Sequence, residues 1–107
     1  MGPSRTGKSW TFLTNHARVL VEITRDPNTR VRDIAGAIGI TERAAQAIVT
    51  DLEVAGYITR TRVGRRTRYG IDASLPFRHP NDADQRVEGL LHLFTEHDAP
   101  SEGELTR

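Results

Sequence analysis

The sequence predicts a mainly α-helical fold with a small β-hairpin: a three-helix core, then the hairpin, then one C-terminal helix. Two observations predict this order. Apolar residues recur at the helical spacing in three successive segments and again near the C-terminus. Between them, residues 57–71 change to an alternating pattern around a central glycine, which is typical of a two-stranded hairpin. At 107 residues the chain can bury one modest core.

The first helix is expected in the segment TNHARVLVEITRDP. Thr14 can cap its start by accepting a hydrogen bond from a free backbone N–H, and Pro27 ends it. One face carries the residues at positions i, i+3, i+4 and i+7, which are Ala17, Leu20, Val21 and Thr24. We expect this face to be buried.

The second helix is expected in TRVRDIAGAIGI and the third in TERAAQAIVTDLEVAGY. Gly39 closes the second helix, Thr41 caps the start of the third, and Gly56 closes it. The expected inward face of the second helix is Val31, Ile34, Ala35 and Ile38, and that of the third is Ala45, Ile48, Val49 and Leu52. Three helices of unequal length therefore follow one another.

The segment YITRTRVGRRTRYGI alternates small or β-branched residues with arginine. It predicts two short strands joined by a tight turn at Gly64-Arg65. The next segment, DASLPFRHPNDAD, has two prolines and three aspartates, so we expect a linker there. Helical spacing returns beyond it and predicts a fourth helix from about Asp82 to Thr95. Its apolar stripe is Val87, Leu90, Leu91 and Phe94.

These elements divide the chain into four parts. Residues 1–9 are expected to be a flexible basic tail, and residues 96–107, which lack apolar periodicity, a disordered tail. Between them lie one folded domain, residues 10–72, and the linker with the C-terminal helix, residues 73–95.

The composition excludes several classes of protein. Without cysteine the chain has no disulfides, thiolate metal sites or thiol redox sensors. No apolar run approaches the roughly 18–20 residues of a membrane span, and we find no signal peptide, so we expect the protein in the cytoplasm. Lys8 is the only lysine among the 15 basic residues, and this arginine-rich usage is typical of GC-rich prokaryotic genomes.

The positive charge is concentrated in one segment. Residues 1–57 hold seven basic and six acidic residues, residues 58–71 five arginines and no acid, and residues 72–107 three basic and eight acidic residues. The whole chain carries +1, yet residues 58–71 carry +5. A local excess of this kind is typical of contact with a polyanion, and an ordinary solvated strand pair is the alternative.

The N-terminal segment GPSRTGKS matches the phosphate-loop pattern G-x-x-x-x-G-K-[ST]. The defined positions are Gly2, Gly7, Lys8 and Ser9. A working phosphate loop needs a preceding buried strand, a surrounding parallel sheet and a downstream aspartate on an apolar strand. Only Met1 precedes the match, and the sequence has no such strand. We therefore interpret the match as coincidence, and nucleotide binding by the chain would test this interpretation.

Residues 31–49, VRDIAGAIGITERAAQAIV, meet the requirements of two helices that cross steeply. Such a crossing needs a small residue where the helices approach, a glycine in the turn, and apolar inward faces. Ala35 and Gly39 supply the first two. The apolar positions are Ile34, Ile38, Ile40, Ala45 and Ile48. This spacing resembles a DNA-binding helix-turn-helix.

The helix-turn-helix continues into LEVAGYITRTRVGRRTRYGI, and together they resemble a winged helix-turn-helix transcription regulator of the broad MarR-like and ArsR-like kind. The segment DLEVAGYI is similar to the end of that family's recognition helix and the first strand of its wing, with Leu52 and Tyr57 as core anchors. The resemblance covers about residues 12–72. It implies sequence-specific binding of double-stranded DNA, usually by a homodimer, and leaves a small-molecule effector open.

The face of the third helix opposite its buried residues is the candidate base-reading surface. It consists of Thr41, Glu42, Arg43, Gln46, Ala47 and Thr50. Arginine can read guanine with two hydrogen bonds and glutamine can read adenine, while Ala47 and the Thr50 methyl group can meet a thymine methyl group. Glu42 can interact with the helix dipole or accept a hydrogen bond from cytosine. An ordinary polar surface is the alternative.

Arginines outside the third helix are expected to hold the DNA backbone. They are Arg30 and Arg32 at the start of the second helix, and Arg62, Arg65, Arg66 and Arg68 of the hairpin. The narrow, arginine-tipped hairpin also suits the minor groove of A·T-rich DNA.

The apolar stripe of the fourth helix must cover either its own domain or a partner, and the resemblance to this family implies a partner helix at a two-fold dimer axis. The candidate interface residues are Val87, Leu90, Leu91 and Phe94, with Trp10 and Phe12 beside them. Packing of the stripe onto the first helix of the same chain is the alternative.

Neither a metal site, a cofactor nor a catalytic site is predicted. The histidine and acidic residues in and after the fourth helix are too few for a metal site. They are Glu88, His92, His97 and Asp98. His16 and His79 are expected at helix starts, as packing or hydrogen-bonding groups. Because we find no Ser/His/Asp set and no paired carboxylates, we expect no enzyme.

A protein–protein interaction module without specific DNA binding is the alternative function, because some winged helices act in that way. The acid-free hairpin and the arginine, glutamine and threonine side chains of the third helix oppose it.

Overall fold

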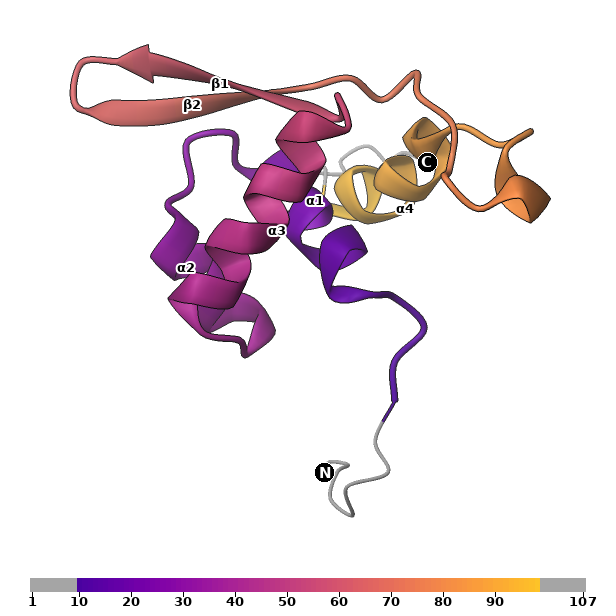
Figure 1. The fold of residues 1–107 in the computed structure, drawn as a ribbon, viewed down its shortest axis with the longest axis horizontal. Helices are drawn as coiled ribbons and strands as arrows, with labels where there is room; N and C mark the ends of the chain where they lie inside the picture. The colour runs from indigo at the N-terminus through magenta and orange to yellow at the C-terminus, as the bar shows by residue number, and fades with distance from the viewer. Residues whose placement is uncertain (1–9, 99–107) are drawn as a thin grey trace, which may run out of the picture.

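The computed structural model describes residues 10–98 (Figure 1). The predicted basic tail, residues 1–9, and residues 99–107 of the predicted disordered tail lie outside this part of the chain. In chain order the described elements are α1 (Asn15–Arg25), α2 (Val31–Ile38), α3 (Glu42–Val54), β1 (Ile58–Val63), β2 (Arg66–Ile71), a short 3-10 helix η1 (Pro80–Asp82) and α4 (Val87–Asp98). The predicted fold, mainly helical with one hairpin, is confirmed.

Threonine side chains begin α1 and α3, as predicted. The Thr14 hydroxyl oxygen accepts a hydrogen bond from the Ala17 N–H at 3.1 Å, and the Thr41 hydroxyl oxygen accepts one from the Ala44 N–H at 3.0 Å. Each bond satisfies one of the N–H groups that a helix start leaves free. Local sequence therefore determines where both helices begin.

The core lies where α1, α2, α3, the base of the hairpin and α4 meet. Its largest fully buried side chains are Ile23, Ile34, Ile58, Val19 and Val49. The inward face predicted for α3 is buried at all four positions, and the two central positions of the α2 face are buried as well. Val31 and Ile38 at the ends of α2 are partly buried and pack against this core.

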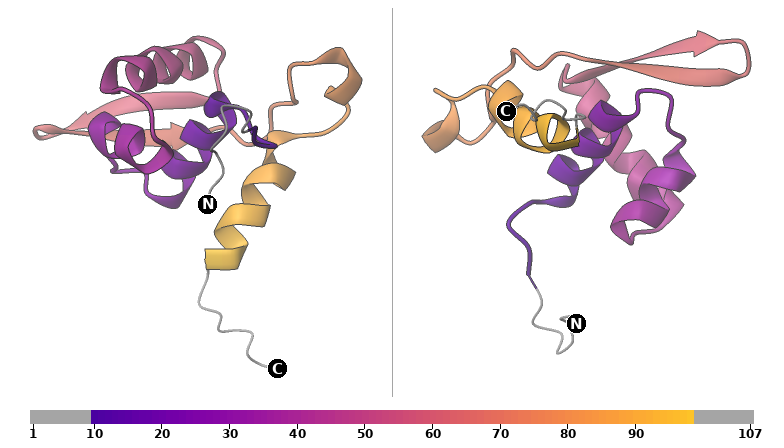
Figure 2. Two further views of the ribbon diagram at one scale, coloured as in Figure 1. Left: turned by 90° about the horizontal axis from the view of Figure 1, so that it is seen from below. Right: turned by 180° about the vertical axis from the view of Figure 1, so that it is seen from behind.

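The buried face of α1 is wider than the predicted one. The two central positions of the predicted face are buried, but its outer positions, Ala17 and Thr24, are only half-buried. Val19 and Ile23 are instead completely buried. α1 contacts α2 and α3 and also α4, so it is covered on more than one side (Figure 2). A search for a single apolar face therefore missed two of its core residues.

Gly39 occupies the turn between α2 and α3. Its φ of 82° lies in the left-handed region, which glycine adopts without steric cost. The N–H groups of Gly39 and Ile40 both donate to the Ala35 carbonyl, at 2.9 and 3.0 Å. These bonds close α2 and turn the chain toward α3.

Replacing Gly39 with alanine is expected to lower the free energy of unfolding by about 1–2 kcal/mol, because a residue with a side chain is strained at positive φ. An added Cβ would meet nothing within 4 Å, so backbone strain alone would cause the loss. Gly36 is the matched control: it lies inside α2 in equally open space, and alanine there is expected to add about 0.5–1 kcal/mol. Urea denaturation measures the free energy of unfolding of both variants. Equal stability of the two would contradict the role assigned to the positive φ of Gly39.

The hairpin is antiparallel, with Ile58 opposite Ile71 at its base and Val63 opposite Arg66 at its tip. Gly64 takes a φ of 64° and the residue after it has a negative φ, which matches a two-residue type II′ turn. The predicted turn position is therefore confirmed.

Residues 73–86 form a bridged loop rather than an open linker. Pro76 pairs with Arg86 as an isolated antiparallel bridge, and the Arg86 guanidinium donates to the Ser74 carbonyl at 2.9 Å. The Tyr57 hydroxyl donates to the Pro76 carbonyl and so attaches the loop to the core. The proline and aspartate content of this segment did not predict the bridge or these hydrogen bonds.

α4 begins at Val87, later than the start near Asp82 that helical spacing predicted, and ends at Asp98, beyond the predicted end at Thr95. The predicted start falls within η1. The N–H groups of Val87 and Glu88 donate to carbonyl oxygens of the preceding loop, at 2.9 and 3.0 Å. Because the loop uses the residues before Val87 for its own bridge, the helix can begin only after it.

α4 packs against α1 of the same chain. Val87 and Leu91 are buried, and the Arg25 guanidinium lies 5.7 Å from the centre of the Phe94 ring. The hairpin tip and the bridged loop lie at opposite ends of the molecule, and α4 lies nearer the end with the loop (Figure 1). Among residues 10–98 no helix is long and apolar enough to cross a membrane.

Candidate nucleic-acid interface

α3 presents a continuous polar face to solvent. All six residues predicted to read bases are exposed: Thr41, Glu42, Arg43, Gln46, Ala47 and Thr50. They face outward because the residues between them, Ala45, Ile48 and Val49, are buried in the core. The Arg43 and Gln46 side chains make no hydrogen bond or ion pair with any other residue in the range 10–98. Both are thus available to an external partner.

Thr41 has a structural role in addition to its exposed position. Its hydroxyl oxygen caps α3, so the side chain is held at the first turn of the helix. The hydroxyl keeps its own proton for donation outward. Glu42, the first residue of α3, lies at the positive end of the helix dipole, where a carboxylate is favourable.

The hairpin is less strongly charged than its sequence suggests. Both Nε and Nη2 of Arg60 donate to Oε1 of Glu53, at 2.9 and 2.7 Å. Glu53 belongs to α3, so the acid that was absent from residues 58–71 comes from a neighbouring element. The other four hairpin arginines have no acidic partner among the described residues, and these are Arg62, Arg65, Arg66 and Arg68.

The loop between α1 and α2 supports the second strand of the hairpin. Arg66 donates to the Asn28 carbonyl at 2.7 Å, and Arg68 approaches the Asn28 side-chain oxygen at 3.4 Å. The Tyr69 N–H donates to the Pro27 carbonyl at 2.9 Å. Sequence reasoning missed Asn28, since it lies 38 and 40 residues from these arginines and matches no motif.

These contacts bring the hairpin beside the start of α2. A cleft of about 340 Å³ lies between them, lined by residues that include Arg30, Arg65, Arg66 and Tyr69. Burial raises the pKa of Tyr69, an effect that nearby Arg60 partly offsets and Glu53 reinforces, so its hydroxyl stays neutral. Arg30 therefore lines the same cleft as the hairpin residues Arg65 and Arg66.

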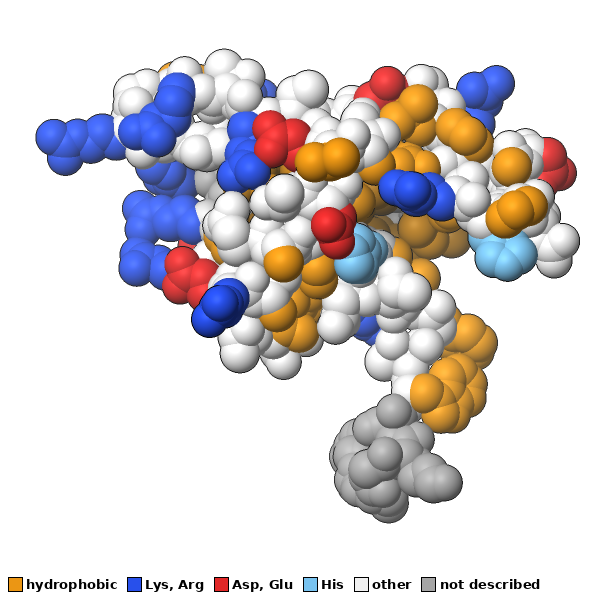
Figure 3. Space-filling model, viewed as in Figure 1, with side chains coloured by type: hydrophobic (Ala, Val, Ile, Leu, Met, Phe, Trp, Pro, Cys, Tyr) orange, Lys and Arg blue, Asp and Glu red, His pale blue; other side chains and the backbone are white. Residues whose placement is uncertain are grey.

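Arginine side chains gather at the hairpin end of the molecule, whereas hydrophobic side chains are more frequent toward the other end (Figure 3). Arg32 is exposed on α2, near this basic end. The predicted backbone-holding arginines and the outward face of α3 therefore lie on neighbouring elements of one half of the domain.

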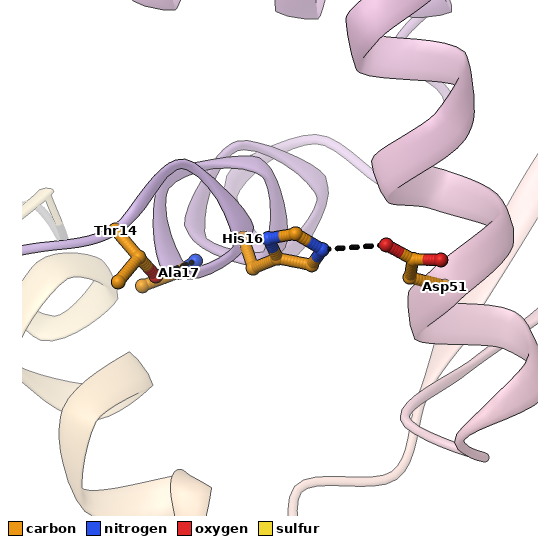
Figure 4. A network of polar contacts seen from close by, with 4 residues as sticks. All are labelled: Thr14, His16, Ala17 and Asp51. Carbon is orange, nitrogen blue, oxygen red and sulfur yellow. Dashed lines mark hydrogen bonds and ion pairs between the residues drawn. The ribbon is translucent and has the colours of Figure 1, made fainter.

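Two histidines make the hydrogen bonds expected of them. Nε2 of His16, in the first turn of α1, lies 2.7 Å from Oδ2 of Asp51 in α3 (Figure 4). Nδ1 of His79 accepts a hydrogen bond from the Asn81 N–H at 3.0 Å and caps η1. The first contact links α1 directly to the helix that carries the candidate base readers.

The predicted dimer residues divide into three groups by their exposure to solvent. Val87 and Leu91 are buried within the chain, because α4 packs against α1. At these two positions the structure agrees with the alternative, in which the stripe packs onto the first helix of the same chain. Leu90 and Phe94 are partly buried. Trp10 and Phe12 are 74% and 91% exposed.

A model of the MarR family matches residues 11–68, which include α1, α2, α3, β1 and the first half of β2. No curated protein matches the chain. The matched segment is more than half of the chain and contains the helix-turn-helix together with most of the hairpin that follows it. Of the two families that the sequence resembles, the match is to MarR, and the chain belongs to the MarR family of winged-helix transcription regulators.

Proposed function

We propose that the protein is a sequence-specific, double-stranded-DNA-binding transcription regulator in which α3 enters the major groove. One observation supports this most strongly: the outward face of α3 is exposed, and its Arg43 and Gln46 side chains have no hydrogen-bond or ion-pair partner among residues 10–98. An α-helix fits the width of the major groove, where each base pair presents a distinct pattern of donors and acceptors.

Within this proposal, side chains on α3 read the bases. Arg43 donates two hydrogen bonds to guanine and Gln46 forms a donor–acceptor pair with adenine. Ala47 and the Thr50 methyl group contact thymine methyl groups. Thr41 and Glu42, at the start of α3, contact the bases at the edge of the site. Helix N-termini commonly enter the groove first in helix-turn-helix proteins.

The arginines around α3 hold the DNA backbone. They are Arg30, which precedes α2, Arg32 of α2, and Arg62, Arg65, Arg66 and Arg68 of the hairpin. The bonds from Arg66 and Arg68 to Asn28 hold β2 against the loop between α1 and α2, which leaves Arg62 and Arg65 to extend along the backbone or into the minor groove.

In this proposal the protein acts as a homodimer, because two protomers related by a two-fold axis can each bind one half of a two-fold DNA site. It acts without a cofactor or catalysis, in the prokaryotic cytoplasm that contains the DNA. The segment GPSRTGKS lies outside the described residues, and an assay of nucleotide binding by the chain tests its interpretation as a coincidental match. Selection of bound genomic fragments, followed by competition with scrambled duplexes, tests sequence-specific binding. Equal affinity for selected and scrambled duplexes would contradict the proposal.

Arginine–phosphate contacts are expected to dominate the affinity. If each protomer makes roughly three to five of them, log K against log salt has a slope of about −5 to −9 for a dimer, from about −0.9 per phosphate neutralised. Arg65→Ala is expected to weaken binding to selected and scrambled duplexes by similar factors and to make this slope shallower by about 0.9 per protomer.

Arg60→Ala is the control for the salt experiment. It removes the same charge from the same hairpin, but Glu53 already pairs with Arg60. We expect a much smaller change in salt slope than for Arg65→Ala. Fluorescence anisotropy at a series of salt concentrations measures the slopes. A slope near zero for the unaltered protein, or equal slopes for the two variants, would contradict the assigned role of the wing.

A further inference from the structure

Two hydrophobic features on the same side of the domain have no partner of their own within the described chain. The first is the arm, residues 10–13, which precedes α1. Its Trp10 and Phe12 rings contact each other edge to face, with centroids 5.2 Å apart, and both are highly exposed. In Figure 3 hydrophobic side chains project from the lower edge of the body, away from the core.

The second feature is a groove of about 680 Å³ between the first turn of α1, the last turns of α3, the bridged loop and the start of α4. Its apolar walls include Ala17, Val54, Phe77 and Leu90. Val54 is 83% exposed although it is a large apolar residue at the end of a helix. Figure 3 shows a hollow lined with hydrophobic side chains on the viewed face.

We propose that the arm of one protomer inserts Trp10 and Phe12 into the groove of a second copy, and that the second arm is inserted reciprocally. The inference rests on the proposed homodimer and names the surfaces that form it. The contact is isologous, since each copy supplies the same arm and the same groove, and such an exchange closes at two copies.

The geometry of the arm favours a second copy over its own groove. Thr14 has an extended conformation and its side chain caps α1, which fixes the direction in which the chain leaves the helix. The Thr11 hydroxyl donates to the Leu13 carbonyl at 2.7 Å, a bond within the arm itself. Accordingly the arm extends away from the domain in Figure 1.

The reach of the arm agrees with reciprocal exchange. Four extended residues span about 14 Å at most, so Trp10 can reach only a surface close to the start of its own α1. The groove has that same start as one wall, through Thr14 and Ala17. A two-fold axis beside the α1 start therefore places each arm within reach of the other groove.

The area available is sufficient for a stable dimer. Aromatic side chains bury about 150–250 Å² each, so four inserted rings and the groove surfaces that they cover bury about 1,200–2,000 Å² in total. Specific interfaces of standard size bury about the same area. Arg78 at the groove rim can stack on an inserted ring.

The groove is lined by the last turns of α3 and not by its first turn. The hairpin tip lies at the other end of the molecule, and the base-reading face begins at the opposite end of α3 from Val54. The exchange therefore joins two protomers without covering the first turns of α3 or the wing.

Trp10 is the only tryptophan, so its fluorescence reports the environment of the arm directly. We expect the emission of the intact chain to shift to shorter wavelength as concentration rises, in step with dimer formation measured by sedimentation. Phe12→Ser in the arm and Val54→Asp in the groove are each expected to weaken the dimer at least about tenfold and to keep the emission at long wavelength. Circular dichroism establishes that both variants remain folded.

Mixing the two variants is the decisive measurement. Each alone has no complete arm–groove pair, whereas a mixed dimer has one, formed by the arm of the Val54→Asp chain and the groove of the Phe12→Ser chain. We expect the mixture to associate more tightly than either variant alone. Leu93→Asp is the control, because Leu93 is 70% exposed on α4 outside the groove and its replacement is expected to change neither association nor emission.

Three outcomes would overturn the exchange. Short-wavelength emission from a monomer would mean that the arm covers its own groove. A dimer that resists Val54→Asp but is lost in Leu93→Asp would place the interface on α4 and leave the homodimer intact. An intact chain that stays monomeric at every accessible concentration would remove both the exchange and the homodimer, while DNA discrimination, which is measured separately, would still test the role of α3.

Discussion

Replacing Arg43 or Gln46 with alanine is expected to cost about 1–3 kcal/mol of binding free energy on the selected DNA site and little on a scrambled duplex. The two side chains lie one turn apart on the exposed face of α3, so both can reach base edges in the same major groove. Neither has a partner among the described residues whose loss would disturb the fold. A fall in discrimination can therefore be attributed to base contacts.

Competition binding against a selected and a scrambled duplex, at two salt concentrations, measures this effect. Arg32→Ala is the matched control, because it removes the same charge from the adjacent helix α2 but is proposed to contact only phosphate. It is expected to lower both affinities and to keep their ratio. If Arg43→Ala and Gln46→Ala distinguish the selected from the scrambled duplex as well as the unaltered protein does, α3 does not read bases. The protein-interaction alternative would then gain support.

Leu91→Ala is expected to lower the free energy of unfolding by about 2–5 kcal/mol, the usual cost of truncating a buried leucine. Leu91 is only 4% exposed, and α4 places it against α1 within the core cluster. For a domain of this size such a loss is a large fraction of the total stability. α4 is then part of the fold and more than an attached dimerisation element.

Leu93→Ala is the control for this experiment. Leu93 lies two residues away on the same helix but is 70% exposed, so its truncation is expected to change stability by less than about 0.5 kcal/mol. Urea denaturation at one protein concentration compares the two variants. Equal losses would show that α4 does not pack through Leu91. If the prediction holds, deleting α4 unfolds the domain, and point substitutions are the proper probes of dimerisation.

The sequence by itself determined the elements whose signals are local. A threonine side chain caps the N–H groups of the adjacent turn, and a glycine is needed where φ is positive, so α1, α3 and both tight turns followed from Thr14, Thr41, Gly39 and Gly64. The outward face of α3 also followed, since helical geometry places Arg43 and Gln46 opposite the buried positions.

Other features depend on residues far apart in the chain. The pairing of Arg60 with Glu53, and of Arg66 and Arg68 with Asn28, decides which hairpin charges remain available. Charge counting along the sequence could not find these partners. Two side chains from different elements meet only after the helices have packed, and no local pattern encodes that distance.

The tertiary structure alone decided what covers the apolar stripe of α4. Periodicity showed that Val87 and Leu91 need cover, but either α1 of the same chain or a partner helix would satisfy that pattern. The bridged loop, anchored by Tyr57, fixes where α4 begins and brings it onto α1. The hydrophobic effect is non-directional, so a sequence can specify which face is buried, whereas the path of the connecting chain specifies the surface that buries it.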